Sequence, residues 1–323
     1  MLHDSYGRQV EYLRLSVTDR CDLRCTYCMP EDFKGYEQTD DWLTFDEIER
    51  VVRAFAHLGV RRIRLTGGEP LLRGNLAGLA GRLSAIPGIA DLSLSTNATH
   101  LAKNAQALHK AGISRLNVSL DTLNPARFAA ITKREALASV LNGLMVASEI
   151  GFAPIKINMV VMAGVNDDEI DAMVAFCMQH GFILRMIETM PVGETGRNAG
   201  FVALAPIRER LRSRFGLVDG VVPGGGPARY LVSHDRRFQV GFITPMSQHF
   251  CETCNRVRLS VDGTLYTCLG QNDKVDVRIM LRAGCSDREL AAALIEGIER
   301  KPFKHEFKEA PDKVIRFMSS TGG

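Results

Sequence analysis

The sequence lacks the long apolar runs of membrane proteins and contains few aromatic residues. No hydrophobic stretch approaches the ~20 residues that a spanning helix needs, and aromatic residues make up 7% of the 323 positions, with a single tryptophan. The first eight residues are mostly polar and do not resemble the apolar segment of a secretory signal. These absences argue against a membrane partner and predict a cytoplasmic protein.

The chain also lacks a marked excess of charge. Its 40 basic and 37 acidic residues leave a formal charge of +3, which does not indicate nucleic-acid binding but leaves a specific anionic ligand open. The length suggests two domains of ~100 to 200 residues each. In a cytoplasmic protein the eight cysteines stay reduced, so they are expected to be metal ligands or core residues rather than disulfides.

Three cysteines, Cys21, Cys25 and Cys28, lie within eight residues, close enough for one metal centre. Three thiolates are one ligand fewer than a closed iron-sulfur or structural zinc site uses, so one coordination position stays open. The open iron of a 4Fe-4S cluster could chelate a small amino acid through its amine and carboxylate, and S-adenosylmethionine suits that position. A zinc knuckle or a set of free thiols is the alternative that the cysteines alone leave open.

Strand and helix patterns alternate along the first part of the chain. Strands are expected at 11–17, 62–66, 91–95, 115–120, 155–161 and 183–188. Helices are expected at 44–58, 76–83, 101–111, 137–150 and 168–180. Six such units with short connections call for parallel strands, and they are too few to close an eight-stranded barrel. We predict an α/β fold with a partial (β/α)6 barrel, whose functional groups lie at the C-terminal ends of its strands.

The rhythm changes after residue 191. We expect a polar linker at 193–200, a short basic helix at 206–215 and a Pro/Gly-rich loop at 221–227. Two antiparallel strands are expected at 230–232 and 238–243, and a hairpin around Asp262-Gly263 is expected from strands at 256–261 and 264–267. We therefore predict two domains, a barrel over 1–191 and a smaller α+β domain over 192–323 that covers the open side of the barrel.

A second cysteine set, Cys251, Cys254 and Cys268, flanks the predicted hairpin. Zinc ribbons combine a cysteine pair and a hairpin in this way, with Cys285 or His249 as a fourth ligand. In a chain that already carries one open three-cysteine set, a second 4Fe-4S cluster with a free iron for substrate is the favoured hypothesis. Cys177, within an apolar helical segment, is expected to be a buried structural thiol.

Several segments resemble known families. Tyr27 directly before Cys28, in a Cys-x3-Cys-x2-Cys loop, resembles the radical S-adenosylmethionine superfamily, and the turn 67–70 (Gly-Gly-Glu-Pro) resembles its methionine-moiety site. Five segments together look like those of the GTP 3',8-cyclase family of molybdenum cofactor biosynthesis: 14–18, 65–73, 117–121, 188–193 and 250–258. The resemblance runs from about residue 5 to the final Gly322-Gly323.

The resemblance implies a lyase with two 4Fe-4S clusters, S-adenosylmethionine as cofactor and GTP as substrate. A 5'-deoxyadenosyl radical is implied to take a hydrogen from the ribose C3', after which C3' attacks C8 of guanine to give (8S)-3',8-cyclo-7,8-dihydro-GTP. The implied cluster ligands are Cys21, Cys25, Cys28, Cys251, Cys254 and Cys268. The implied S-adenosylmethionine contacts are Tyr27, Gly68, Ser119 and Met190. The implied GTP contacts are Arg14, Arg64, Ser95, Lys156, Arg256, Val257 and Arg258.

The residues themselves support part of this assignment. Arg14, Arg64 and Lys156 each interrupt an otherwise apolar strand, and a triphosphate with about four negative charges needs several such cations. A charge within a strand commonly lies on a solvated face, but in a barrel the other face lines the cavity. Ser95 stands where the family is expected to have threonine, so the hydroxyl is kept.

The resemblance also implies partners. They are an electron donor of the flavodoxin or ferredoxin kind and a downstream cyclic pyranopterin monophosphate synthase; a homodimer is left open. The Gly-Gly tail is implied to enter the active site near Arg14. Two other functions are weighed, a radical peptide maturase with an auxiliary cluster and a zinc-ribbon nucleic-acid-binding protein without catalysis. The small net charge argues against the second, and the single C-terminal cysteine set beside two arginines argues against the first.

Overall fold

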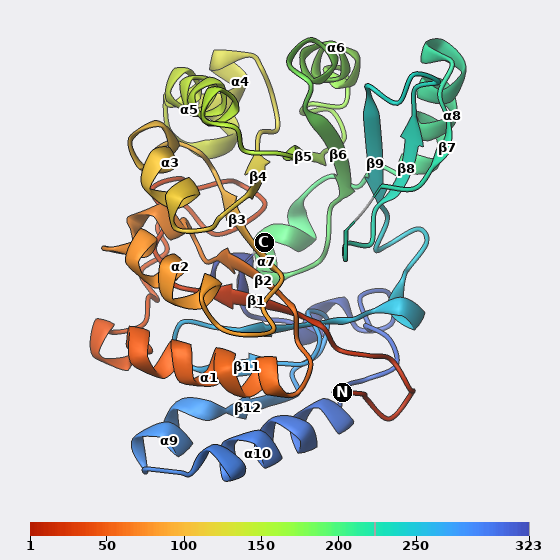
Figure 1. Ribbon diagram of the computed structural model, residues 1–323. Helices are drawn as coiled ribbons and strands as arrows, with labels where there is room; N and C mark the ends of the chain where they lie inside the picture. The colour runs from red at the N-terminus through yellow and green to blue at the C-terminus, as the bar shows by residue number, and fades with distance from the viewer. Residues whose placement is uncertain (223, 323) are drawn as a thin grey trace.

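One continuous sheet runs through the computed structural model, which describes residues 1–222 and 224–322 (Figure 1). The order of its twelve described strands is β12-β11-β10-β1-β2-β3-β4-β5-β6-β9-β8-β7. The strands are β1 Tyr12–Ser16, β2 Arg62–Thr66, β3 Asp91–Thr96, β4 Arg115–Ser119, β5 Ile155–Val161, β6 Ile183–Glu188, β7 Val218–Gly220, β8 Arg229–Val232, β9 Gln239–Ile243, β10 Arg256–Leu259, β11 Thr264–Tyr266 and β12 Lys274–Asp276. Neighbouring strands from β10 to β9 pair in parallel, and the outer strands pair antiparallel.

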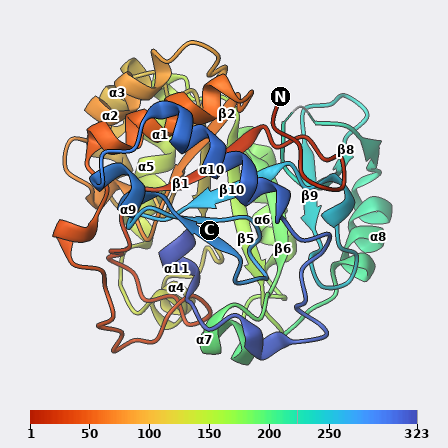
Figure 2. The ribbon, with the colours of Figure 1, turned by 90° about the horizontal axis from the view of Figure 1, so that it is seen from below.

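The described helices are α1 Phe45–His57, α2 Leu76–Ser84, α3 Leu101–Lys110, α4 Pro125–Thr132, α5 Leu137–Ile150, α6 Ile170–His180, α7 Gly193–Asn198, α8 Leu204–Phe215, α9 Val277–Arg282, α10 Asp287–Glu299 and α11 Met318–Thr321. Most of them lie on the outer face of the sheet, whereas α7 and α11 contribute residues to the interior of the barrel (Figure 2). Short 3-10 turns lie at Thr39–Asp41, Pro70–Leu72, Cys251–Thr253 and Pro311–Lys313. None of the described helices has the length and apolar character required to cross a membrane.

Local sequence explains where the first helix begins. The Thr44 side chain accepts from the Glu47 amide, and the Glu47 carboxylate accepts from the Thr44 amide, which forms the predicted capping box. The apolar face of α1 then buries Ile48, Val51 and Phe55 against the sheet. The predicted helix at 44–58 is thus confirmed to within its end residues.

The strands divide their side chains between two environments. Leu13 and Leu15 on β1 are fully buried in the core that the sheet forms with the outer helices. The alternate residues face the inside of the barrel, and there they are polar: Ser93, Asn117 and Arg185 are buried on this face. Side chains of successive strand residues point to opposite faces, so a strand that reads as apolar with one charge places that charge in the cavity.

The predicted open barrel of six βα units is confirmed, but the position of the C-terminal strands was not predicted. β9 pairs in parallel with β6, and β10 pairs in parallel with β1, so the C-terminal segment extends the barrel sheet at both ends. The antiparallel pairs β8–β9 and β10–β11 agree with the expected strands and hairpin. The strands of the C-terminal segment and those of the six βα units therefore form one sheet around one interior.

The expected linker at 193–200 is wrong, because most of it is helix α7. Gly193 and Gly196 let this helix pack closely: a Cβ on Gly193 would lie 2.7 Å from the Phe317 ring, and one on Gly196 would lie 2.4 Å from the Met190 carbonyl oxygen. Tertiary packing here outweighs the low helix propensity of glycine.

Candidate active site

A single cavity of about 290 Å³ lies inside the barrel and contains almost every predicted site residue. All six cysteines of the two sets line it, as do Tyr27, Gly68, Ser119, Met190, Arg14, Arg64, Ser95, Arg256, Val257 and Arg258. Among the predicted site residues that the structure describes, Lys156 alone is absent from this lining. Two cysteine sets that lie more than 200 residues apart in the sequence therefore share one chamber.

The first cysteine set lies on the loop that follows β1. The Cys28 amide donates to the Cys25 carbonyl at 2.8 Å, and the Arg24 guanidinium donates to the Cys21 carbonyl at 2.7 Å. Burial is the main cause that raises the pKa of Cys28 to about 11, and it also raises the pKa of Cys25. These thiols are therefore protonated when no metal is bound, and metal binding would release their protons.

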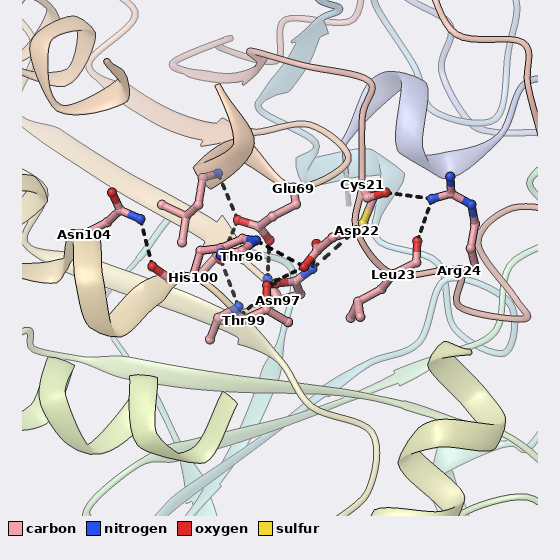
Figure 3. A network of polar contacts seen from close by, with 12 residues as sticks. Cys21, Asp22, Leu23, Arg24, Glu69, Thr96, Asn97, Thr99, His100 and Asn104 are labelled. Carbon is pink, nitrogen blue, oxygen red and sulfur yellow. Dashed lines mark hydrogen bonds and ion pairs between the residues drawn. The ribbon is translucent and has the colours of Figure 1, made fainter. Parts of the chain in front are cut away.

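A carboxylate network lies behind this loop (Figure 3). Glu69 is fully buried and accepts from the Thr96 hydroxyl at 2.7 Å and from the Asn97 amide at 2.6 Å. Burial raises the pKa of Glu69 to about 7, although these donors oppose the shift. The Asn97 side chain in turn donates to Asp22 at 2.8 Å and approaches the Cys21 sulfur at 3.9 Å. The network thus fixes the start of the cysteine loop against the end of β3.

The two glycines of the turn 67–70 are needed for a contact that the sequence did not indicate. A Cβ on Gly67 would lie 2.2 Å from the Thr18 carbonyl oxygen, and one on Gly68 would lie 2.3 Å from the Arg20 carbonyl oxygen. The Gly68 amide donates to the Thr18 carbonyl at 2.9 Å. Both glycines also line the cavity, so their missing side chains admit the backbone before the cysteine loop and leave the turn open to a ligand.

Tyr27 is held in the cavity wall by a buried carboxylate. Its hydroxyl donates to Asp121 at 2.8 Å, and the Val160 amide donates to the other oxygen of Asp121 at 2.8 Å. Burial raises the pKa of Asp121 to about 6, against the effect of these two hydrogen bonds. The ring of Tyr27 is therefore fixed directly beside the cysteine set.

The second cysteine set lies on the turn before β10, with Cys251 and Cys254, and two residues after the end of β11, with Cys268. Burial would raise the pKa of Cys254, but the charges of Lys301 and Arg256 lower it to about 7. Neither Cys285 nor His249 is among the residues that line the cavity. The Cys285 carbonyl accepts from Arg50 on α1, away from the three cysteines that line the cavity.

The donor chemistry of both sets fits iron-sulfur clusters. Each set presents three thiols to the cavity, and three thiolates leave one iron open to a small ligand. Within 1–222 and 224–322, no group of three or more His, Cys, Asp or Glu side chains is gathered closely enough to hold a single metal ion.

Arginines from adjacent strands occupy the space between the two sets. Arg258 on β10 lies beside Arg14 on β1, which lies beside Arg64 on β2. The Nε atoms of Arg14, Arg64 and Arg256 are buried and have no hydrogen-bond partner among the described residues. Burial, with the charges of Arg258 and Arg64, lowers the pKa of Arg14 well below its usual value. Positive charges gathered in this way, with buried N–H groups that lack a partner among the described residues, are costly unless an anion joins them, so this part of the cavity suits a polyanion.

Two further basic residues lie at the same level of the barrel. Arg185 on β6 donates to Asn158 at 2.9 Å and to Asn117 at 2.5 Å, and it lines the cavity. Lys156 on β5 lies outside the lining, with its Nζ 5.9 Å from the centre of the Tyr230 ring. Arg185 was not predicted, although it interrupts an apolar strand as Arg14 does. The signal was present in the sequence and was overlooked.

The end of the chain enters this arginine cluster. Figure 2 shows α11, the last described helix, near the middle of the molecule. The Arg258 guanidinium donates to the Gly322 carbonyl and, at 3.3 Å, to the Thr321 carbonyl. The expected neighbour was Arg14, which lies beside Arg258 in the sheet. The other tail residue, Gly323, lies outside the described residues.

The remaining two cysteines have no part in the cavity. Cys177 on α6 is fully buried in the hydrophobic core, and burial raises its pKa to about 12. The prediction of a structural thiol is in agreement with this position.

Comparison with family models defines the class of protein. A model described as the radical SAM superfamily matches residues 15–177, and one described as molybdenum cofactor synthesis C matches residues 182–307. The first model spans half of the chain, which places the chain in the radical S-adenosylmethionine superfamily.

Curated relatives make the family specific. GTP 3',8-cyclase 1 of Pseudomonas aeruginosa is 48% identical over 326 residues, covering 99% of this chain and 98% of the relative. The GTP 3',8-cyclase of Pseudomonas fluorescens is 44% identical, covering 100% of this chain and 99% of the relative, and that of Paracoccus denitrificans is 44% identical with coverages of 100% and 96%. The chain belongs to the GTP 3',8-cyclase family.

Solved structures agree on the fold. SuiB of Streptococcus suis bound to S-adenosylmethionine has a TM-score of 0.63 at 16% identity, covering 90% of this chain and 68% of SuiB. SuiB bound to its precursor peptide SuiA has a TM-score of 0.64 at 16% identity, with coverages of 92% and 66%. At this identity the likeness concerns the fold alone, so it does not favour a peptide substrate.

Proposed function

We propose that this chain converts GTP to (8S)-3',8-cyclo-7,8-dihydro-GTP, the first step of molybdenum cofactor biosynthesis. The observation that carries the proposal is one cavity lined by both three-cysteine sets and by arginines, three of which have a buried Nε without a hydrogen-bond partner among the described residues. Family membership supports the same reaction. A peptide maturase would not need cations buried around the substrate position.

The cofactors are two 4Fe-4S clusters and S-adenosylmethionine. Cys21, Cys25 and Cys28 hold the first cluster, and its open iron with S-adenosylmethionine supplies the radical that removes a hydrogen atom from the ribose. Cys251, Cys254 and Cys268 would hold the second cluster, and three thiolates would leave one of its irons without a protein ligand and free to bind substrate. Tyr27, Gly68, Ser119 and Met190 are the proposed contacts to S-adenosylmethionine.

The protein's own residues bind and orient GTP. Arg14, Arg64, Lys156, Arg256 and Arg258 are the proposed triphosphate ligands, and bidentate guanidinium contacts suit phosphate oxygens. The Ser95 hydroxyl is buried without a hydrogen-bond partner among the described residues, which supports its role as a substrate donor. Val257 is also a proposed GTP contact, because it lines the cavity between Arg256 and Arg258.

Other assignments complete the proposal. We propose a division into residues 1–191 and 192–323, which the separate matches of two family models support. A cytoplasmic location, a flavodoxin-like or ferredoxin-like donor and a downstream cyclic pyranopterin monophosphate synthase follow from the family resemblance. The oligomeric state is best measured directly, by sedimentation of the protein with its clusters.

Anaerobic turnover tests the function. The purified protein, incubated with GTP, S-adenosylmethionine and dithionite, should form 5'-deoxyadenosine together with an isomer of GTP, both measured by mass spectrometry. Iron analysis should give about eight irons per chain, four for each cluster. A chain with Cys254→Ala should keep about half of the iron and lose the GTP isomer.

Two outcomes would contradict the proposal. Zinc without iron in protein purified anaerobically would favour a zinc-ribbon binding module. Eight irons and 5'-deoxyadenosine without any GTP isomer would point to another substrate, such as a peptide. Cys177→Ala is the matched control, because it removes a thiol that the cavity does not use.

Lys156 makes GTP binding depend on pH. Burial, with the charges of Arg185 and Arg115, lowers the pKa of Lys156 to about 7. A bound triphosphate favours the charged amine and raises this pKa, so the complex holds more protons than the free protein above pH 7. We expect GTP binding to take up as much as about one proton and to weaken as the pH rises above 7, by at most about tenfold per pH unit.

Calorimetry in buffers with different ionisation enthalpies measures the proton uptake. At pH 8 the uptake should disappear in Lys156→Met, which should also bind GTP more weakly. Lys103→Met, which removes an exposed lysine on α3, should leave it unchanged. Equal uptake by Lys156→Met and the unaltered protein would show that Lys156 does not meet the triphosphate.

A further inference from the structure

A buried lysine connects two of the three segments that carry the second cysteine set. Lys301 follows α10 and is 2% exposed. Its Nζ donates to the Thr267 carbonyl at 2.5 Å and to the Arg256 carbonyl at 3.2 Å. Thr267 directly precedes Cys268, and Arg256 lies two residues after Cys254. One ammonium group therefore ties together the backbones that present these two thiols.

The third segment is attached to the same part of the chain by an arginine from the N-terminus. The Arg8 guanidinium donates to the Cys251 carbonyl at 2.7 Å and also to the carbonyls of Pro302 and Phe303, each at 2.7 Å. Arg8 is itself held by Asp4 at 2.6 Å. The segment 301–303 is thus the point at which the supports of all three cysteines meet.

The positive charge of Lys301 is not neutralised by a carboxylate among the described residues. Among the described residues no carboxylate forms an ion pair with it, whereas the nearby Lys304 and Lys313 pair with Glu309 and Glu306. An ammonium group has three N–H donors, and two of them bind the carbonyls. The side chain lines the cavity beside Cys254 and Cys268. A buried cation without a partner is costly unless a negative group is supplied, and a 4Fe-4S cluster held by three thiolates is net negative.

We propose that Lys301 is a positioning residue for the second cluster, which fixes the arms of Cys254 and Cys268 and raises the reduction potential of the cluster through its buried charge. The inference rests on the proposed second cluster. Cluster potentials depend on net charge and on hydrogen bonds to the sulfurs, and a fixed positive charge favours the reduced, more negative form. The residue thus acts on the cluster itself, without contact to the reacting atoms of GTP.

Redox titration of the second cluster alone tests the proposal. In the full-length chain with Cys21, Cys25 and Cys28 replaced by alanine, only the second cluster is assembled, and its midpoint potential is followed by electron paramagnetic resonance. Lys301→Gln keeps N–H donors but removes the charge, so it should retain the iron and shift the midpoint to a more negative value. Lys301→Met removes both and should also lose part of the iron. Lys308→Met, an exposed lysine, should leave the potential unchanged.

Each result decides the matter. A midpoint in Lys301→Gln equal to that of the unaltered lysine overturns the electrostatic role, and full iron with the same potential in Lys301→Met overturns the whole proposal. Should either variant lose the cluster completely, Lys301→Arg, which keeps charge and donors, must restore it for the proposal to stand. If the parent chain with an intact Lys301 holds no iron, the proposed function fails along with this inference. If the parent holds iron and the Lys301 variants have its iron content and midpoint potential, this inference alone is refuted.

Discussion

Replacing Arg14 with methionine is expected to lower kcat/KM for GTP by about 100-fold or more and, at the same time, to stabilise the protein that lacks its clusters. Each charge-assisted hydrogen bond to a phosphate is worth ~1.5–3 kcal/mol, or roughly 10- to 100-fold, and a guanidinium makes two. Without substrate the same group lies beside Arg258 and Arg64 with a buried Nε that has no partner. Its removal therefore relieves repulsion in the empty site and weakens the filled one.

The opposite signs distinguish this result from general damage. Thermal unfolding of the cluster-free chain should show a higher midpoint for Arg14→Met, and GTP should stabilise the unaltered protein more than the variant. Arg53→Met is the matched control, because Arg53 pairs with Glu49 on the exposed side of α1, and such pairs contribute ~0–1 kcal/mol. A lower midpoint together with unchanged GTP turnover in Arg14→Met would refute the assignment of Arg14 to the triphosphate.

Much of the fold follows from local sequence signals. The six strand-helix units were predicted because apolar strands alternate with helices of regular apolar spacing. The capping box at Thr44 and Glu47 is a further local signal, since it marks the start of the first helix. The placement of β9 beside β6 and of β10 beside β1 could not be predicted in this way. Pairing between strands far apart in the chain depends on the assembled sheet. The periodicity within a strand does not indicate which other strand will pair with it.

The site shows the same division. The two cysteine sets and the arginines within apolar strands were visible because such residues are unusual in those positions. Arg185 carried the same signal and was missed, because the prediction followed the family resemblance rather than the pattern. The roles of Lys301 and Asn97 could not be predicted from the sequence. Lys301 follows a helix and Asn97 follows a strand, where a polar residue is not unusual. Their importance comes from backbone carbonyls and sulfurs that only the folded chain brings near them.

Replacing Gly322 with alanine is expected to reduce GTP turnover by about 100-fold or more while both clusters remain assembled. Gly322 has φ +75° and ψ 138°, a backbone conformation occupied essentially by glycine, which costs an alanine on the order of 1–3 kcal/mol. The added Cβ would also lie 2.2 Å from Cγ2 and 2.7 Å from Oγ1 of Thr66, so the tail could not keep the carbonyl that Arg258 binds. Removal of Gly322 and Gly323 together should have the same effect. The measurements are mass analysis of the GTP isomer and iron content.

Gly284 separates the steric clash from the backbone strain. It also has a positive φ, +79°, but a Cβ there would have no atom within 4 Å. Gly284→Ala therefore places an alanine at a positive φ outside the cavity, without a clash, and should leave turnover unchanged. If the tail acts by placing Arg258, Arg258→Met should lose turnover to a similar extent, and combining it with Gly322→Ala should add little, because both remove one contact. Full turnover in the truncated chain would mean that Arg258 binds GTP without help from the tail.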